Sequence, residues 1–588
     1  MRSSLFVMLC ILAGAGLFGS SPAQAAPRST APLGTTQTTT ILPKKLQAQD
    51  FGVKGDGVTD DGPAVLRMLD AAARAGGTVT LQFAPRRSYF LKTGRDGYAL
   101  ALDGAHDLVL DGGDSLFLID SSQRFLKLTH SRNVTVRGFK VDYVPLPFAD
   151  GTVVAKDKAK GTLDVHIDAD QALPPSGGPT HEADEQAFFG ALWAPGPYST
   201  QGAGGAYWMR HNLDVRNVSA ASPSRVVRVE SNPGASVFDE VVVGKWRFSV
   251  PVRGIAHRYG AGETCRLVNN AGITLENLEI WSAPWFAFGI TDNRVRVTLR
   301  RVNVRPKPDT QRNASSWRDA FHAKNNRASL RWEECTVQGS GDDAFNIATH
   351  TSTVFQVVTP TQIKLSQNYP LGVASMEVGD TLGFYDPVKG ALLGRAKITK
   401  VDPANFAGDK APLFTLDLDA PVAGLARGTT LAWNETSGNP HNVLYRCRMD
   451  TSCRFRSPVL LDTCQVNALA WFTGDEIESP LPSNSKIVDS QFRLGQGNTS
   501  QVIVMGGMYL EGHGPTHNVL ANIIFNHNRV WGGVTLNDIK GLTITDNDFA
   551  DAKRMVSLSN VADVIFRGNS HGGLPVEDTG DMMGHADF

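Results

Sequence analysis

The sequence predicts an all-β fold, a right-handed parallel β-helix that carries small β-barrel-like inserts. Short segments in which apolar and polar residues alternate, each broken by a polar turn at Asn, Arg or Gly, recur along the chain. Aligned segments advance by 24 residues between Thr274 and Thr298 and by 21 between Thr543 and Val564. This period, with strands and without a leucine-rich consensus, is typical of one coil of a parallel β-helix. The repeating segments are 133–141, 272–280, 296–304, 328–337, 541–549 and 562–570.

The first residues have the pattern of an export signal followed by a tether. An apolar stretch over 5–19 leads to Ala-Gln-Ala at 23–25, the small-x-small pattern after which signal peptidase cuts. We therefore expect a signal peptide over 1–25, cut near Ala25, and a secreted or periplasmic protein. Residues 26–42 are rich in Ser, Thr and Pro and predict a disordered tether. No later stretch has the roughly 18 consecutive apolar residues of a membrane span.

The rest of the chain alternates between coils and two interruptions. A turn-rich run at 50–61, a helical spacing over 64–75 and a strand at 78–81 predict a cap over the first edge of the solenoid. Short strand runs broken by Gly, Pro and Asp mark the interruptions as small β modules. The predicted units are a cap with the first coils over 43–147, an inserted β module over 148–250, coils with the candidate site over 251–349, a second inserted β module over 350–433, and C-terminal coils over 434–588.

Charge and cysteine content narrow the classes of ligand. The 57 Lys and Arg nearly balance the 58 Asp and Glu. This balance argues against a nucleic acid or a strongly anionic polymer and favours a neutral ligand. Five cysteines follow the signal, and Cys447 and Cys453 are close enough in sequence to pair, whereas the simpler interpretation makes most of the five small core residues. Their C-x5-C spacing predicts no structural metal site.

Three aspartates form the candidate catalytic group. Asp319 stands in Trp-Arg-Asp-Ala-Phe-His, and 23 residues later Asp342 and Asp343 stand in Gly-Asp-Asp-Ala-Phe-Asn. Because 23 residues is about one coil, we expect Asp319 to lie against the pair, where the like charges keep one carboxyl protonated near neutral pH. Glycoside hydrolysis needs one carboxylic acid and one carboxylate, so no metal or organic cofactor is expected. An isolated Asp-Asp is more often a solvated turn or a calcium site; the third Asp, with His322 and Asn346 nearby, favours catalysis.

Further residues complete the predicted substrate pocket. The predicted substrate-binding residues are His322, Asn346, Arg456, Trp471 and Glu478. Arg454 and Arg456 are the obvious cations for a carboxylated sugar. Aromatic residues precede the candidate site, and each ring either stacks on sugar or fills the core. They are Trp281, Trp285, Phe286, Phe288, Trp471 and Phe472.

These residues resemble known families. The run at 50–61, Asp-Phe-Gly-Val-Lys-Gly-Asp-Gly-Val-Thr-Asp-Asp, is similar to the N-terminal cap of pectin-degrading β-helix enzymes, including polygalacturonases. The pattern Asp319-x-x-His322, followed by Gly-Asp-Asp-Ala-x-Asn-Ile at 341–347, resembles glycoside hydrolase family 110, the α-1,3-galactosidases of the pectin-lyase-like β-helix superfamily. That family also carries small β-barrel inserts. The resemblance implies inverting exo-hydrolysis of a terminal α-linked galactose on an oligosaccharide or polysaccharide, with Asp319, Asp342 and Asp343 as the catalytic set.

The chain departs from the family pattern at one place, and other functions stay open. Where a Trp-x-Glu-Gly-Pro-like stretch is expected, the chain has Glu-Ile-Glu-Ser-Pro at 476–480. The first alternative is a polygalacturonase-like hydrolase or a polysaccharide lyase acting on a uronic-acid polymer; the Gly-His-Gly at 512–514 lies far downstream of the Asp pair. The second is a noncatalytic carbohydrate-binding solenoid, which would not need three clustered Asp. The two inserts either bind sugar or pair two chains in a homodimer.

Overall fold

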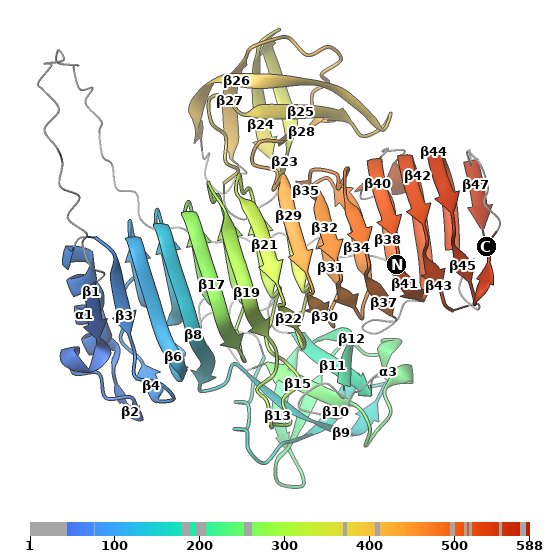
Figure 1. The fold of residues 1–588 in the computed structure, drawn as a ribbon. Coiled ribbons are helices and arrows are strands. Elements are labelled where there is room, and N and C mark those ends of the chain that lie inside the picture. The colour runs from blue at the N-terminus through green and yellow to red at the C-terminus, as the bar shows by residue number, and fades with distance from the viewer. Residues whose placement is uncertain are drawn as a thin grey trace, which may run out of the picture.

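The computed structural model describes residues 44–75, 77–178, 189–195, 207–251, 262–368, 373–405, 412–493, 500–510, 514–516, 520–551, 556–576 and 584–587. The predicted signal peptide and tether lie outside these residues. The described chain is a parallel β-helix with two β modules that project from it on opposite sides (Figure 1). The all-β, parallel β-helical class is therefore confirmed; the right-handed sense of the coil stays a prediction.

A short cap precedes the coils. The 3-10 helix η1 (Ala48–Phe51) and the helix α1 (Gly62–Ala75) cover the first strands (Figure 1). Helix α1 turns Val65, Met68 and Leu69 inward, at the spacing of one helical face. The expected helix over 64–75 is present and begins two residues earlier.

Three parallel ladders run the length of the solenoid. In the first, which carries the candidate site, the strands in spatial order are β5 (Tyr98–Asp103), β7 (Arg124–Thr129), β16 (Cys265–Val268), β18 (Phe288–Thr291), β20 (Phe321–Lys324), β23 (Phe345–Thr359), β31 (Cys453–Phe455), β34 (Ala470–Asp475), β38 (Gln501–Leu510), β42 (Gly533–Thr545) and β44 (Val556–Arg567).

The second ladder pairs the strands that follow the first corner of each coil. Its order is β1 (Lys44–Gln47), β3 (Val79–Gln82), β6 (His106–Asp120), β8 (Arg132–Val144), β17 (Ala271–Ile280), β19 (Val297–Val304), β21 (Ser329–Glu333), β29 (His441–Tyr445), β32 (Val459–Asp462), β36 (Lys486–Val488) and β40 (Leu520–Asn526), ending on β42 and β44.

The third ladder closes each coil, and β6, β8, β17 and β19 bend to serve both the second and the third. Its other strands are β2 (Asp56–Asp60), β4 (Ser88–Leu91), β22 (Thr336–Val337), β30 (Arg448–Met449), β33 (Gln465–Val466), β37 (Gln491–Arg493), β41 (Arg529–Trp531), β43 (Asp548–Phe549) and β45 (Ser570–His571). Four short strands pair antiparallel with the ladders: β35 (Glu478–Ser479), β39 (Gly514–Thr516), β46 (Leu574–Pro575) and β47 (Gly584–Asp587).

The register of the coils corrects one of the two repeat lengths. Thr274 pairs with Thr298, as the 24-residue repeat predicted. Thr543 pairs with Ile565 rather than Val564, so that coil advances by 22 residues, not 21. Val564 and Ile565 are both β-branched and apolar, so the sequence alone does not show which of them aligns with Thr543. A slip of one residue turns a side chain to the other face of the strand.

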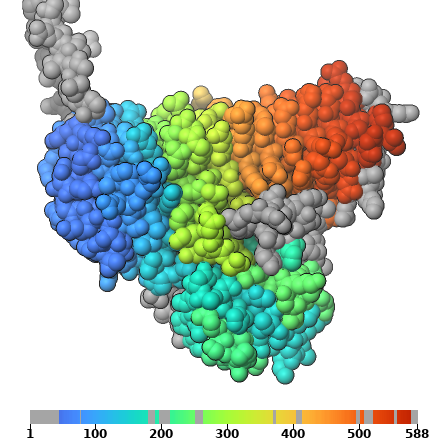
Figure 2. All heavy atoms as spheres, turned by 60° about the horizontal axis from the view of Figure 1, so that its bottom comes forward, coloured from blue at the N-terminus to red at the C-terminus, as the bar shows by residue number. Residues whose placement is uncertain are grey.

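The two modules differ in how their strands pair. The first is one antiparallel sheet in the order β12 (Tyr207–Asp214), β11 (Phe189–Pro195), β15 (Arg247–Pro251), β9 (Phe148–Asp157), β10 (Thr162–Ile167), β14 (Val226–Glu230) and β13 (Asn217–Ala221), with a helical turn α3 (Val237–Glu240). The second closes on itself, because β23 pairs with β24 (Gln362–Gln367), which is followed in order by β27 (Leu413–Leu418), β26 (Ala391–Asn405), β25 (Thr381–Asp386) and β28 (Leu431–Asn434), and β28 returns to β23. Figure 2 shows the first module projecting from the side of the solenoid.

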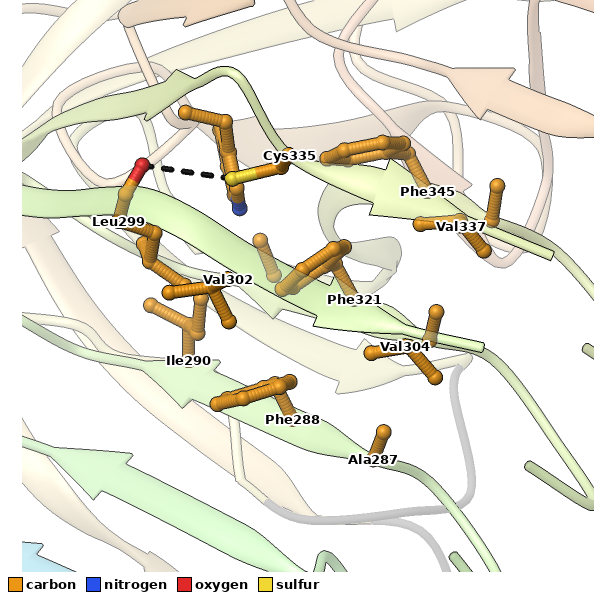
Figure 3. Packing of buried hydrophobic residues seen from close by; sticks show 14 of the residues in the cluster. Ala287, Phe288, Ile290, Leu299, Val302, Val304, Phe321, Cys335, Val337 and Phe345 are labelled. Carbon is orange, nitrogen blue, oxygen red and sulfur yellow. Dashed lines mark hydrogen bonds between the residues drawn. The ribbon is translucent and has the colours of Figure 1, made fainter. Parts of the chain in front are cut away.

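The interior of the solenoid is a continuous apolar core. Phe288, Phe321 and Phe345 point inward from consecutive strands of the first ladder (Figure 3), with ring centroids 5.1 Å and 4.9 Å apart. Residues such as Val297 and Leu299 alternate inward from the second ladder and are fully buried. All five described cysteines are free and buried, so Cys447 and Cys453 do not pair.

Candidate active site

The inward phenylalanines fix the position of the three aspartates. Asp319 and Asp343 each precede, by two residues, the first phenylalanine of a strand, Phe321 in β20 and Phe345 in β23. These phenylalanines are paired in the ladder and stacked in the core, and the amide of Ala320 donates to the carbonyl of Asp343 at 2.9 Å. The two aspartates therefore leave the coil at the same corner. Asp342 extends the pair, and carboxylate oxygens of all three lie within 4.8 Å of one another.

Each carboxylate of the cluster has a different environment. Asp343 is buried. Its Oδ1 accepts from Ser452 Oγ at 2.8 Å, and its Oδ2 lies 3.0 Å from Arg454 Nε. Asp342 has 32% of its side chain exposed and accepts from Arg318 Nη1 at 3.3 Å. Asp319 is 3% exposed.

Burial and mutual repulsion perturb the protonation of this cluster. Burial first, and then the charges of Asp342 and Asp343, raise the pKa of Asp319 well above its ordinary value. Burial raises the pKa of Asp343 to about 6, although Arg454 and Ser452 oppose the shift. Since the pKa values of Asp319 and Asp343 are both raised, the cluster holds at least one proton close to neutral pH.

A second, fully ion-paired cluster lies beside the aspartates. Lys324 Nζ donates to Glu478 Oε1 and, at 2.8 Å, to Asn346 Oδ1. Arg456 binds the other oxygen of Glu478 through Nη1 and reaches Asp475 Oδ2 at 2.5 Å through Nη2. Burial alone would raise the pKa of Glu478, but Arg456 and Lys324 outweigh it and hold this pKa well below its usual range. Glu478 is therefore ionised.

Two buried histidines adjoin the ion pairs. Burial first, and then the charge of Lys324, lower the pKa of His322 well below its ordinary value and that of His350 to about 3. Both imidazoles are thus neutral near pH 7. The ring of His322 stacks on Phe286 with centroids 4.6 Å apart.

Ladder register places three of the five predicted substrate residues, His322, Asn346 and Trp471, in one row together with Arg454. His322 pairs with Asn346, Asn346 with Arg454, and Arg454 with Trp471. Trp471 is 40% exposed and lines an open cavity of about 180 Å³ together with Arg454, Arg456, Thr473, Gly474 and Asp475. Of the other predicted aromatics, Phe288 lies in the core, Trp281 and Trp285 are buried, and Phe286 is partly buried.

The first module reaches the corner that bears the aspartates. The ring of Trp317 is enclosed between Phe148 at 5.4 Å and Phe189 at 5.0 Å, both nearly parallel to it. The guanidinium of Arg318 lies over the rings of Phe189 and Trp285, and Asn212 donates to the carbonyl of Gly341 at 3.3 Å.

The structure also brings in residues that the sequence analysis missed, above all Lys324, Ser452 and Asp475. Lys324 could have been found, because it follows His322 by two positions in a strand and so shares its face. Ser452 and Asp475 come from coils more than a hundred residues further along, and no local spacing pointed to them. Residues Gly512 and His513 lie outside the described residues.

The three aspartates are close enough to act as acid and base or to hold a cation. Both oxygens of Asp343 already have donors, and the positive charge of Arg454 beside Asp343 opposes a cation there. Among the described residues no helix is long and apolar enough to cross a membrane.

Comparison with known proteins supports the resemblance described above. No family model matches the chain. The chain is 23% identical over 70% of its length, and 67% of the relative's, to "Alpha-1,3-galactosidase B" of Bacteroides thetaiotaomicron, and 24% identical over 78% of its length, and 76% of the relative's, to "Alpha-1,3-galactosidase A" of Streptomyces avermitilis. "Alpha-1,3-galactosidase A" of Shewanella woodyi is 23% identical over 60% of each chain.

Solved structures of low similarity include two β-helix proteins. One is a hyperthermoactive exopolygalacturonase from Thermotoga maritima, with a TM-score of 0.32, 10% identity, and 93% and 95% of the two chains covered. The other is the A-module of the mannuronan C-5 epimerase AlgE4 from Azotobacter vinelandii, with a TM-score of 0.30, 11% identity, and 89% and 99% covered. The resemblance predicted from the segments around Asp319 and Asp342 is confirmed by the sequence relatives: the chain is a distant homologue of the α-1,3-galactosidases, which are glycoside hydrolases.

Proposed function

We propose that the chain is an exported exo-glycoside hydrolase that removes terminal α-linked galactose, α-1,3-galactosidase-like in its linkage, through acid and base catalysis by Asp319, Asp342 and Asp343. The observation that carries the proposal is the meeting of three carboxylates from adjacent coils, within 4.8 Å, in a chain related to α-1,3-galactosidases. Three clustered carboxylates oppose stability, and they supply the proton donor and the base that glycoside hydrolysis requires.

The environments of the carboxylates support a division of roles. Asp343, whose pKa is raised to about 6, is protonated in mildly acidic solution and gives its proton to the glycosidic oxygen. The adjacent Arg454 then pairs with the carboxylate that forms. Asp342, the most exposed of the three, accepts the proton of the attacking water, and Asp319, whose raised pKa favours the protonated form, holds that water by a hydrogen bond.

The neighbouring ion-paired cluster suits the hydroxyl groups of a neutral sugar. Asn346, Arg456 and Glu478 present fixed donors and acceptors, because each is held by Lys324 or by its own ion pair. Trp471 offers a partly exposed ring on which the apolar face of a sugar can stack. His322, neutral and stacked on Phe286, completes the row.

Inversion of the anomeric centre is part of the proposal. In two-carboxylate glycosidases a separation of about 6.5–9.5 Å accompanies inversion and about 5–5.5 Å accompanies retention. The carboxylate oxygens here lie within 4.8 Å of one another, but three carboxylates do not form such a pair. Two of them can hold the water on one side of the sugar while the third protonates the glycosidic oxygen on the other side. Proton NMR of the first product formed, before mutarotation, checks this: β-galactose supports inversion and α-galactose contradicts it.

A uronic-acid substrate is less well supported. Four cations of the site, Arg318, Lys324, Arg454 and Arg456, are each paired with a carboxylate of the protein. A substrate carboxylate would have to compete with those ion pairs, whereas a neutral galactose would not. This pairing favours the hydrolase of neutral sugars over both the polygalacturonase-like and the lyase alternatives.

The decisive experiment compares substrates and metal dependence in one series. Purified protein is assayed with nitrophenyl glycosides, with Galα1-3Gal oligosaccharides and with polygalacturonate, before and after dialysis against EDTA. We expect release of galactose from the α-galactosides, unchanged by EDTA. Unsaturated product from polygalacturonate, or activity that EDTA abolishes and calcium restores, would point to the lyase; sugar binding without turnover would point to a noncatalytic solenoid.

A further inference from the structure

A crevice lies between the second module and the C-terminal coils, apart from the aspartate cluster. Its volume is about 660 Å³, within the range of roughly 300–1,000 Å³ that ligand sites occupy. One wall belongs to the module, the floor to the segment after Glu478, and the other wall to β40. The lining includes Tyr385, Leu392, Arg395, Trp433, Glu435, Pro480, Leu481, Asn484, Ala521 and Asn522.

The lining combines a buried aromatic junction, an exposed leucine and paired polar groups. The rings of Tyr385 and Trp433 lie 5.4 Å apart and meet Leu481 across the junction between module and coils. Arg395 Nε and Glu435 Oε2 form an ion pair at 2.8 Å, so their charges cancel. Asn522 Nδ2 donates to Asn484 Oδ1 at 3.0 Å, and both amides are exposed.

This chemistry matches one class of ligand. A neutral sugar has an apolar face, which the exposed Leu392 can contact, and hydroxyls that both donate and accept, as the amides, the guanidinium and the carboxylate here require. An anionic ligand would have to displace Glu435 from Arg395. A purely structural junction accounts for the buried rings but not for the open volume, in which Arg395 keeps 56% and Leu392 40% of their surface exposed.

The crevice is linked to the aspartate site by a short segment. Asp475 and Glu478 bind Arg456 on the side of the aspartates. Pro480 and Leu481, two and three residues after Glu478, line the crevice. We propose that this crevice is a second, noncatalytic carbohydrate-binding site, which takes a neutral oligosaccharide segment of the same polymer that the active site trims. The identity of the polymer rests on the proposed function, whereas binding in the crevice requires no turnover.

The test fills the crevice without touching the aspartate site. Ala521→Trp places an indole in the cavity from β40. Lys400→Trp, at a side chain 59% exposed on the second module, is the control for an added surface tryptophan. Binding is measured by retardation in native gels that contain a neutral galactomannan or, separately, polygalacturonate, with every protein carrying Asp343→Asn so that no polymer is cut.

We expect the galactomannan affinity to fall roughly tenfold or more with Ala521→Trp and to stay unchanged with Lys400→Trp. In the background with Asp343 intact, turnover of a nitrophenyl α-galactoside should be the same for both. Equal retardation of the two variants, or retardation by polygalacturonate alone, would overturn the proposal. So would a change from dimer to monomer with Ala521→Trp in sedimentation, because a second copy of the chain would then fill the crevice. Gel retardation needs no turnover, so its outcome is independent of whether the chain is a galactosidase.

Discussion

The charge balance at the aspartate cluster follows from individual side chains. Asp343 is buried with a positive neighbour, Asp319 is buried between like charges, and Asp342 is partly exposed. Burial and like-charged neighbours thus raise the pKa values of Asp319 and Asp343. The neighbouring Glu478, buried equally but held by Lys324 and Arg456, shows the opposite shift.

Replacement of the proposed proton donor should depend on the leaving group. Asp343→Asn removes the acid, so we expect alkyl or sugar leaving groups to lose about 10²–10⁴-fold in kcat and activated aryl galactosides far less. Asp319→Asn and Asp342→Asn should damage both substrate types alike, since activation of water is needed in either case. Steady-state kinetics on the two substrate types, with thermal unfolding to check the fold, make the comparison. Near-wild-type turnover in any of the three variants would show that its residue has another role.

The pH dependence has a sign that follows from the raised pKa. Because the proton donor must be protonated, kcat/KM should fall as pH rises through about 6, the pKa of Asp343. The unfolded carboxyl titrates near 4, so the native state binds the extra proton between about pH 4 and 6 and loses stability as pH rises through that window. Urea unfolding of the wild type and of Asp343→Asn between pH 4 and 7 should show the variant gaining relative stability with pH. A constant difference would mean that Asp343 is not titrating there.

At the scale of the element, ladders of identical side chains hold the coils in register. Asn270, Asn293, Asn326 and Asn439 are stacked at the corner after the first ladder. The side chain of Asn293, for example, donates to Leu267 O at 3.1 Å and to Asn326 Oδ1 at 2.9 Å. Its oxygen accepts from the backbone amide of Asn270. Residues at these corners adopt the left-handed conformation, for example Asn269, Asp292 and Asn325, with φ near +55°.

Interrupting the ladder should be costly, because a buried polar group loses several partners at once. Asn293→Ala leaves the amide of Asn270 and the carbonyl of Leu267 without partners, and we expect a loss of roughly 1–3 kcal/mol in the free energy of unfolding. Asn217→Ala is the control. Its side chain donates to Glu230 Oε1 at 3.3 Å in the sheet of the first module, and its loss should cost under about 0.5 kcal/mol. Chemical denaturation measures both; equal effects would refute the importance of the ladder.

The sequence predicted the coils and the aspartates because both repeat locally. The alternation around Thr274 and the Asp-Ala-Phe triplets at 319–321 and 343–345 each recur one coil later, so their proximity follows from the period. The partners Ser452 and Asp475 could not be predicted, because the second module separates them from the aspartates in sequence. The free state of Cys447 and Cys453 likewise depends on the register, which buries Cys447 at the corner between β29 and β30 and Cys453 in β31.

At the scale of the whole molecule, the two modules flank the sheet that carries the site. The second module continues β23, the strand that begins beside Asp343, and the first contacts the corner before it (Figure 1). Arg247 of the first module binds the carbonyl of Gln311 at 2.7 Å, and Asp150 accepts from the amide of Asn313 at 3.1 Å, so the module also holds the segment that leads to Trp317. The aspartate corner is thus supported from outside the solenoid.

This support predicts that a residue of the first module controls turnover without touching the aspartates. Phe189→Ala removes one of the two rings that enclose Trp317. The same ring is one of two beneath Arg318, which donates to Asp342. Since displacement of a reacting group by about 1 Å can cost on the order of 100-fold, we expect kcat to fall about 10- to 100-fold. Val154→Ala, 41% exposed on the same module, should leave it unchanged. The coils do not depend on Phe189, so the far-ultraviolet spectrum should stay that of a β protein; full activity in Phe189→Ala would show that the solenoid alone positions Asp342.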